Sequence, residues 1–143
     1  MLKVVIDTNV WVSALISSKG KPRQVVSIIQ QSGFIFFYPK QLIEELQEVP
    51  EKPRLAPKIS SSQIERLVTL IESRGRLVEL DSVVLAVSRD PKDDPFLACA
   101  QSVGCNYLVT GDKDMLVLQF HGTTKILTPA GFLSVLESGG EDG

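Results

Sequence analysis

The sequence predicts an α/β fold, in which a mostly parallel central sheet of about five strands is covered by helices on both faces. Short apolar segments rich in β-branched and aromatic residues alternate with longer segments of helical periodicity. Strands that are apolar along their whole length are typical of parallel sheets buried between helices. The 143 residues are 43% hydrophobic, which suits one core. We expect a single domain over residues 1–138 and a flexible polar tail over 139–143.

The expected strands are short apolar segments flanked by residues that favour turns. They are Leu2–Ile6, Phe34–Tyr38, Arg76–Leu80, Tyr107–Thr110 and Lys125–Leu127. The expected helices begin at capping or proline signals and carry an apolar face. They begin after Asp7, at Pro22 (to about Gln31), at Pro39, at Ser60 (to Arg74), at about Asp94 (to Val103) and at Pro129 (to about Glu137). Several prolines predict irregular structure over Glu48–Ile59, and residues 90–95 are expected to form a turn.

Charge and hydropathy limit the classes of function. The net charge is −2 and the pI is near 5.4, so a nucleic-acid role would need bound cations to supply positive charge for phosphate. No apolar run reaches the roughly 18 residues of a membrane-spanning helix, and the N-terminus lacks the features of a signal peptide. We therefore expect a cytoplasmic protein without a membrane partner. Cys99 and Cys105 have neither zinc nor redox spacing and are expected to be buried free thiols.

Acidic residues gather where the expected strands end. They are Asp7 after the first strand, Glu44 and Glu45 on the helix after the second, Asp93 and Asp94 at the start of a later helix, and Asp112 and Asp114 after the fourth strand. In parallel α/β folds, sites form outside the carboxyl ends of the strands. Each acid alone could be a helix cap or a solvated residue, but together they predict one shared site.

Clustered carboxylates repel one another and take up protons unless a counter-charge is present. A hard divalent cation supplies that charge, and all-oxygen ligands favour Mg²⁺ or Mn²⁺. Such cations can activate water and stabilise a phosphodiester during hydrolysis. No other catalytic set competes: His121 lies in an expected loop, and no Ser or Cys stands in a nucleophile motif. Trp11 is expected to pack in the core or an interface rather than to stack on a base.

Four segments resemble the motifs of the PIN-domain family of ribonucleases. They are Val5–Val10, Leu42–Leu46, Asp93–Ala100 and Leu108–Asp114, and the likeness runs from Val4 to about Leu136. The resemblance implies a PIN-like nuclease domain whose catalytic and metal-binding carboxylates are Asp7, Glu45, Asp94 and Asp112, with Asp114 as an accessory ligand. Asn9, Asp93 and Thr110, within the same motifs, are expected to have accessory roles. Pro50 departs from the family pattern and is expected to shorten the helix that carries Glu45.

The subgroup that the chain resembles contains bacterial and archaeal toxins of toxin–antitoxin pairs, and Leu127–Leu133 is similar to its ending. The resemblance implies an RNA substrate and an antitoxin protein as partner. The expected helix from Pro22 to Gln31 carries apolar residues on more than one face, namely Val25, Val26, Ile28 and Ile29. That surplus suits an antitoxin or a second copy of the chain, and both stay open, as does a housekeeping role in RNA processing.

Two other functions use a similar acidic site. A haloacid-dehalogenase-like phosphatase needs a second Asp two residues after its nucleophile, where this chain has Asn9, and the chain is short for that fold. A non-enzymatic receiver-type signalling module needs its acidic pair after the first strand, whereas Asp93 and Asp94 come late. Both are alternatives to the function that the sequence favours, a metal-dependent endoribonuclease.

Overall fold

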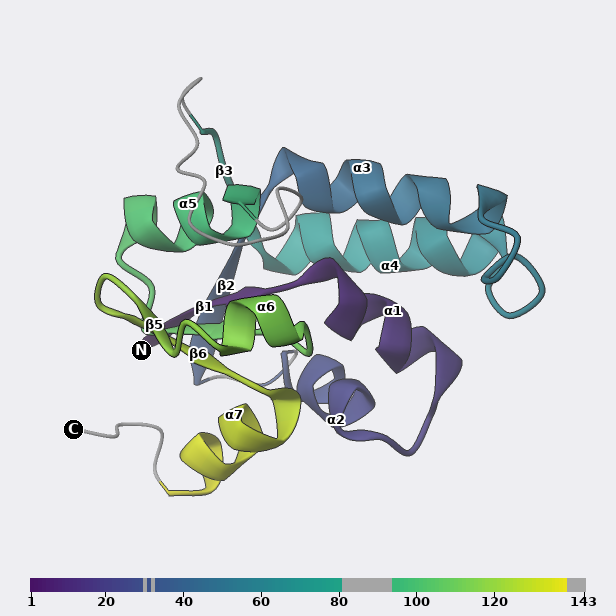
Figure 1. Cartoon of the computed structure of the whole chain (residues 1–143). Helices are drawn as coiled ribbons and strands as arrows, with labels where there is room; N and C mark the ends of the chain where they lie inside the picture. Colours follow the sequence, from purple (N-terminus) through teal and green to yellow (C-terminus); the bar gives the residue numbers. More distant parts are fainter. Residues whose placement is uncertain (30, 32, 81–93, 139–143) are drawn as a thin grey trace.

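A six-stranded sheet forms the centre of the computed structural model, which describes residues 1–29, 31, 33–80 and 94–138 (Figure 1). The strands are β1 (Leu2–Ile6), β2 (Phe34–Pro39), β3 (Arg76–Val78), β4 (Tyr107–Val109), β5 (Phe120–His121) and β6 (Thr124–Leu127). Their order is β3-β2-β1-β4-β6-β5, and every neighbouring pair is parallel except β5 with β6. The predicted mostly parallel sheet is confirmed, and it has one strand more than expected.

Helices cover both faces of this sheet. They are α1 (Thr8–Ile16), α2 (Lys21–Ile28), α3 (Lys40–Glu48), α4 (Ser61–Arg74), α5 (Asp94–Val103), α6 (Lys113–Leu116) and α7 (Pro129–Glu137), and a short 3₁₀ turn, η1 (Val49–Glu51), follows α3. In Figure 1, α3, α4 and α5 lie on one side of the strands and α2 and α7 on the other. The predicted arrangement of helix, sheet and helix layers is therefore confirmed. Within the described residues, no helix is both long and apolar enough to cross a membrane.

The core centres on β1, which lies between β2 and β4. Val4, Val5 and Ile6 are fully buried there, so β1 is apolar on both faces as a covered parallel strand should be. Trp11 is also buried, packs its ring against Phe36 with centroids 5.4 Å apart, and donates from Nε1 to the Ile6 carbonyl over 3.2 Å. Trp11 is thus a core residue that locks α1 onto β1, as the sequence favoured.

Local sequence signals explain where α4 and α7 begin. Ser60 accepts a hydrogen bond from the Gln63 N–H, and the Gln63 side chain accepts one from the Ser60 N–H, so α4 begins at a complete capping box. The Thr128 hydroxyl caps α7 by accepting from the Gly131 N–H at 3.0 Å, and α7 begins at Pro129 as predicted. Cys99 and Cys105 are buried free thiols, as expected, and burial raises the pKa of Cys99 to about 12.

Three elements differ from the expectation. The helix expected to reach Gln31 ends at Ile28. There the Ile29 N–H donates to the Val26 carbonyl, three residues back, at 3.3 Å, which closes a tighter turn than that of an α-helix. The segment around His121 is an edge hairpin rather than a loop: Gly122 adopts a positive φ of 62°, which lets β5 fold back on β6. Helix α6 was not expected, and it forms because the Asp112 carboxylate accepts from the Asp114 N–H at its first turn. The turn expected over 90–95 and the tail over 139–143 fall largely outside the described residues.

The contact between Gly75 and Phe36 generates a stability prediction. A Cβ placed on Gly75 would overlap the Phe36 ring, whereas a Cβ on Gly111 would meet no atom within 4 Å. Gly75→Ala should therefore lower the free energy of unfolding by about 1–3 kcal/mol, through overpacking against β2. Gly111→Ala, the matched control, should leave it unchanged or slightly raise it. Urea unfolding of both variants measures this, and equal stabilities would show that the ring yields without cost.

Candidate active site

Asp7 stands at the carboxyl end of β1, where both flanking elements fix its backbone. Its N–H donates to the Val109 carbonyl on β4 at 2.9 Å, and its carbonyl accepts from the Val10 N–H at 3.0 Å as α1 begins. Asp7 occupies the N-cap position of α1, but its carboxylate makes no capping hydrogen bond. Instead the Thr110 hydroxyl donates to Oδ2 over 2.8 Å. Asp7 is therefore not merely a helix cap, and its side chain is only 3% exposed.

Glu45 reaches the same place from α3. The Thr8 hydroxyl donates to Glu45 Oε1 over 2.5 Å, which ties the start of α1 to the middle of α3. Thr8 was not among the expected site residues, so its hydrogen bond to Glu45 is a part of the site that sequence reasoning missed. Its position directly after Asp7 at a strand end was the available signal.

Asp112 approaches from the loop that follows β4. Its N–H donates to Thr110 Oγ1 over 3.0 Å, and its Oδ1 caps α6. The Thr110 hydroxyl thus links two predicted site residues, because it donates to Asp7 and accepts from Asp112. Asp114 is half-buried in the first turn of α6 and is not among the described residues that line the pocket below.

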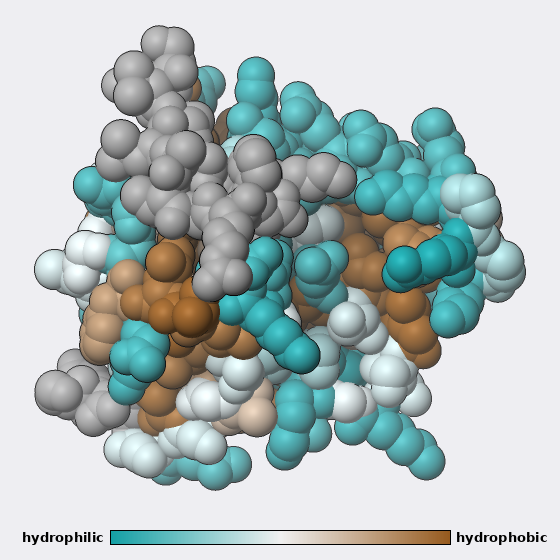
Figure 2. All heavy atoms as spheres, in the orientation of Figure 1, coloured by the Kyte–Doolittle hydropathy of each residue, from teal (hydrophilic) through white to brown (hydrophobic). Residues whose placement is uncertain are grey.

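These side chains open into a pocket of about 450 Å³, here called the acidic pocket. Its lining residues are Asp7, Thr8, Asn9, Val12, Gln41, Glu44, Glu45, Glu48, Val49, Lys52, Leu55 and Asp112. Five of them are acidic and one is a lysine, so the pocket is strongly negative. Figure 2 shows hydrophilic residues gathered over α3. The exposed Glu44 and Glu48 of this helix form part of the rim of the acidic pocket.

The electrostatics of the pocket centre on Asp7. Burial raises the pKa of its carboxyl from 3.8 to about 6, against the lowering effect of the Thr110 hydrogen bond. The nearby carboxylates of Glu45 and Asp112 contribute to this rise, and no positive side chain in the described part of the chain is among the groups that shift the pKa of Asp7. Among the described residues, no positive side chain therefore offsets the charge of an ionised Asp7.

A bound divalent cation fits this donor set. Asp7, Glu45 and Asp112 offer hard oxygen ligands, and the Gln41 Oε1 atom in the same pocket is buried without a hydrogen-bond partner. Among the side chains that the structure describes, no three acidic, His or Cys groups lie close enough to enclose an ion by themselves. The predicted fourth carboxylate, Asp94, is the first residue of α5, and its side chain is not among those described.

The topology nevertheless places Asp94 at the right edge. Helix α5 leads into β4, which is parallel to β1, so α5 runs back from the carboxyl edge of the sheet to its opposite edge. Its first turn therefore begins on the side where Asp7 and Asp112 stand. Asp93 lies outside the described residues.

Gln41, Glu48 and Lys52 also line the acidic pocket and were not predicted as site residues. Gln41 lies four residues before Glu45, and Glu48 lies three residues after it, so Gln41, Glu45 and Glu48 share one face of α3. Lys52 follows on the segment after η1, where prolines end the helical pattern. The helical spacing around Glu45 was the signal that could have identified Gln41 and Glu48.

Comparison with known proteins identifies the family and supports the fold. The family described as "PIN domain" matches residues 3–114. The uncharacterized protein MJ1680 of Methanocaldococcus jannaschii is 28% identical over 119 residues, which cover 82% of this chain and 76% of that protein. A chain in the crystal structure of VapBC2 from Rickettsia felis, bound to a DNA fragment from their promoter, has a similar fold. Its TM-score is 0.58 at 11% identity, and the match covers 87% of this chain and 97% of that chain.

The raised pKa of Asp7 makes stability without metal depend on pH. Because the folded-state pKa lies above the unfolded value of 3.8, the folded state binds this proton more tightly. The stabilisation that comes from binding this proton is fully present below pH 3.8 and is lost as the pH rises through about 6. Between about pH 4 and pH 7.5, the free energy of unfolding should fall by about 2 to 2.5 kcal/mol relative to Asp7→Asn.

Urea titrations of chelator-treated wild type and Asp7→Asn across this range measure the difference. Subtracting the variant removes the contribution of the other carboxylates, which titrate in both proteins. Parallel pH profiles for the two proteins would show that Asp7 does not carry an unfavourable charge.

Proposed function

This chain belongs to the PIN-domain family, and we propose that it is an endoribonuclease that hydrolyses RNA phosphodiester bonds at the acidic pocket with Mg²⁺ or Mn²⁺. The observation that carries the proposal is the buried Asp7 carboxylate, which faces Glu45 and Asp112 and whose pKa is not lowered by any described positive side chain. A protein keeps such an arrangement at a cost in stability, which is typical of functional sites.

The proposed ligands are Asp7, Glu45, Asp94 and Asp112, with Asp114 as an accessory residue. Bound divalent cations would supply the positive charge that the phosphodiester and its attacking water require. The chain's own residues hold the carboxylates in place: the Thr110 hydroxyl orients Asp7, and the Thr8 hydroxyl orients Glu45. Asn9 is exposed at the rim, where its amide can hydrogen-bond to the RNA strand.

The alternatives are not favoured by the family match. A phosphatase of the haloacid-dehalogenase type would need a proton donor where Asn9 stands, and an amide does not titrate. A receiver-type module would need its acidic pair beside the first strand, whereas α5 begins at Asp94, late in the chain.

We also propose that this nuclease is the toxin of a toxin–antitoxin pair. The motif resemblance and the fold shared with a chain of VapBC2 support this role. Of the four apolar residues of the α2 region, Val25 and Ile29 are buried, whereas Val26 and Ile28 remain half-buried. Val26 lines a groove of about 350 Å³ between α2 and α4, whose other lining residues are Leu15, Arg23, Ser27, Gln63, Arg66, Leu67 and Leu70. An apolar antitoxin segment lying there is the proposed partner, with a second copy of this chain as the alternative occupant.

Neighbouring glutamates on α3 provide the sharpest test of the nuclease assignment. Glu45→Gln should lower the cleavage rate of single-stranded RNA at least about 100-fold, because it removes a charge that Thr8 holds at the centre of the site. Glu44→Gln makes the same chemical change on the exposed rim and should retain most activity. Asp7→Asn and Asp94→Asn should behave like Glu45→Gln.

A chelator should abolish wild-type cleavage, and added Mn²⁺ should restore it. The readout is gel analysis of a labelled RNA, with each variant purified identically to exclude contaminating nuclease. Equal losses in Glu44→Gln and Glu45→Gln, or full activity in Asp94→Asn, would refute the proposed ligand set.

The partner proposal is tested on α2. Val26→Asp should weaken binding of the protein encoded beside this gene at least about tenfold, since it buries a charge in the groove. Gln24→Asp, an exposed position on the same helix outside the groove, is the matched control. RNA cleavage by Val26→Asp should then resist inhibition by that protein. Light scattering shows whether the chain instead forms a homodimer. A chain that stays monomeric and does not bind the protein encoded beside its gene would contradict both versions.

A further inference from the structure

A second pocket adjoins the acidic pocket and differs from it in charge. It has a volume of about 400 Å³ and is here called the flanking pocket. Its lining residues are Asn9, Val10, Ser13, Lys21, Pro22, Gly111, Thr128, Pro129 and Ala130. None of these is acidic, and Lys21 carries the charge. An anion that the acidic pocket would repel can therefore lie here.

The two pockets form one continuous surface. Asn9 lines both of them, and Gly111 of the flanking pocket is bonded to Asp112 of the acidic pocket. Gly111 leaves this junction open, because a Cβ at that position would meet no atom within 4 Å. A strand whose phosphate lies among Asp7, Glu45 and Asp112 can thus continue into the flanking pocket without crossing a ridge at Gly111.

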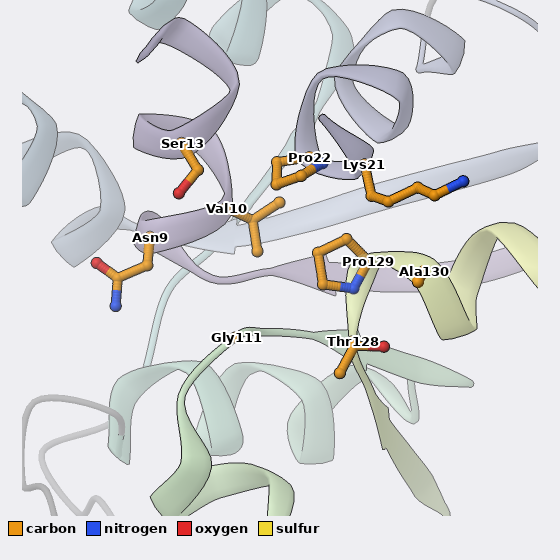
Figure 3. Close-up of a pocket in the computed structure, with 9 residues that line it drawn as sticks. All are labelled: Asn9, Val10, Ser13, Lys21, Pro22, Gly111, Thr128, Pro129 and Ala130. Carbon is orange, nitrogen blue, oxygen red and sulfur yellow. The ribbon is translucent and has the colours of Figure 1, made fainter. Parts of the chain in front are cut away.

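Figure 3 shows how the lining is arranged. Val10, Pro22 and Pro129 point toward one another in the middle of the pocket, Asn9 lies at one end, and the Lys21 amine extends beyond the prolines at the other. Along the surface, the Asn9 amide is therefore followed by an apolar floor and then by the Lys21 cation. One nucleotide with its two flanking phosphates offers groups in the same order: a phosphate for the amide, a flat base for the apolar floor and the next phosphate for the cation.

We propose that the flanking pocket binds the nucleotide next to the cleaved bond, with its base against Val10, Pro22 and Pro129 and its outer phosphate at Lys21. This inference rests on the proposed ribonuclease function and assigns a substrate subsite to it. Apolar contact with a base is tolerant of sequence, whereas the lysine contributes charge attraction that depends on salt. Lys21 would act on binding rather than on the chemical step.

Two exposed positions allow the subsite to be altered without disturbing the core. Lys21→Gln removes the cation, and Ala130→Glu places a carboxylate against the proposed phosphate. Lys19→Gln removes an exposed lysine that does not line the pocket and controls for overall charge. Melting temperatures of all three should match the wild type.

The binding assay uses a short, fluorescein-labelled single-stranded RNA and protein carrying Asp7→Asn to prevent cleavage. Lys21→Gln should weaken binding on the order of five- to tenfold and reduce the slope of log affinity against log salt by about 0.7. Ala130→Glu should weaken it at least as much, and Lys19→Gln should have little effect. Single-stranded DNA of the same sequence and inorganic phosphate serve as competitors that separate a requirement for RNA from simple anion binding.

The cleavage assay, in otherwise wild-type protein, separates the subsite from the chemistry. Lys21→Gln should raise KM for the short RNA while leaving kcat unchanged, and it should not alter cleavage of a dinucleotide without terminal phosphates, which lacks the outer phosphate that Lys21 would bind. If both pocket variants match Lys19→Gln while wild type still cleaves RNA, the subsite is refuted and the proposed function stands. If wild type cleaves no RNA, the proposed function fails and the subsite assignment fails with it.

Discussion

The structure depends on one unfavourable interaction, the burial of the Asp7 carboxylate at the carboxyl end of the central strand. The backbone of Asp7 is fixed by β4 on one side and by the first turn of α1 on the other, and its side chain is only 3% exposed. Burial together with the charges of Glu45 and Asp112 raises its pKa to about 6, which places the cost of ionisation near neutral pH. Around this carboxylate, threonine hydroxyls hold the acidic residues in place, and the pocket has room for a cation that would offset their charge.

Two threonine hydroxyls hold the carboxylates together. Thr110 bridges Asp7 and the backbone of Asp112, and Thr8 bridges the start of α1 and Glu45 on α3. Hydrogen bonds of this kind favour the ionised carboxylate without neutralising it, so they leave the negative charge available to a cation. Under the proposed function, these carboxylates are a preorganised set of oxygen ligands that costs stability, and the neighbouring flanking pocket, whose lining has no acids, would accept the rest of a polyanionic strand.

Much of this fold was predictable because hydrophobic patterning and chain topology determine it. The apolar strand before Asp7 had to lie inside a covered sheet, and parallel order then placed the residues after β1 and β4 at one edge. The position of Asp112 followed from that rule, and so did the start of α5 at Asp94. The same rule could not predict the hydroxyl of Thr8 on Glu45, because that contact depends on how α1 and α3 pack.

Local elements were harder to predict where one residue serves two roles. Asp112 was expected as a site residue, and the short helix α6 that it also caps was not. The β5–β6 hairpin depends on a positive φ at Gly122, and the hydropathy pattern of the sequence does not predict backbone angles. Gln41 and Glu48 share the helical face of Glu45, yet their role depends on the shape of the pocket rather than on any motif.

The central claim is that a divalent cation compensates the buried carboxylate of Asp7. Anomalous scattering from crystals grown with Mn²⁺ tests it most directly, because the signal locates manganese independently of activity. The account predicts a peak in contact with Asp7 and at least one of Glu45, Asp94 and Asp112, and no peak there in Asp7→Asn crystals. An empty acidic pocket at millimolar Mn²⁺, or manganese bound only elsewhere on the surface, would contradict it.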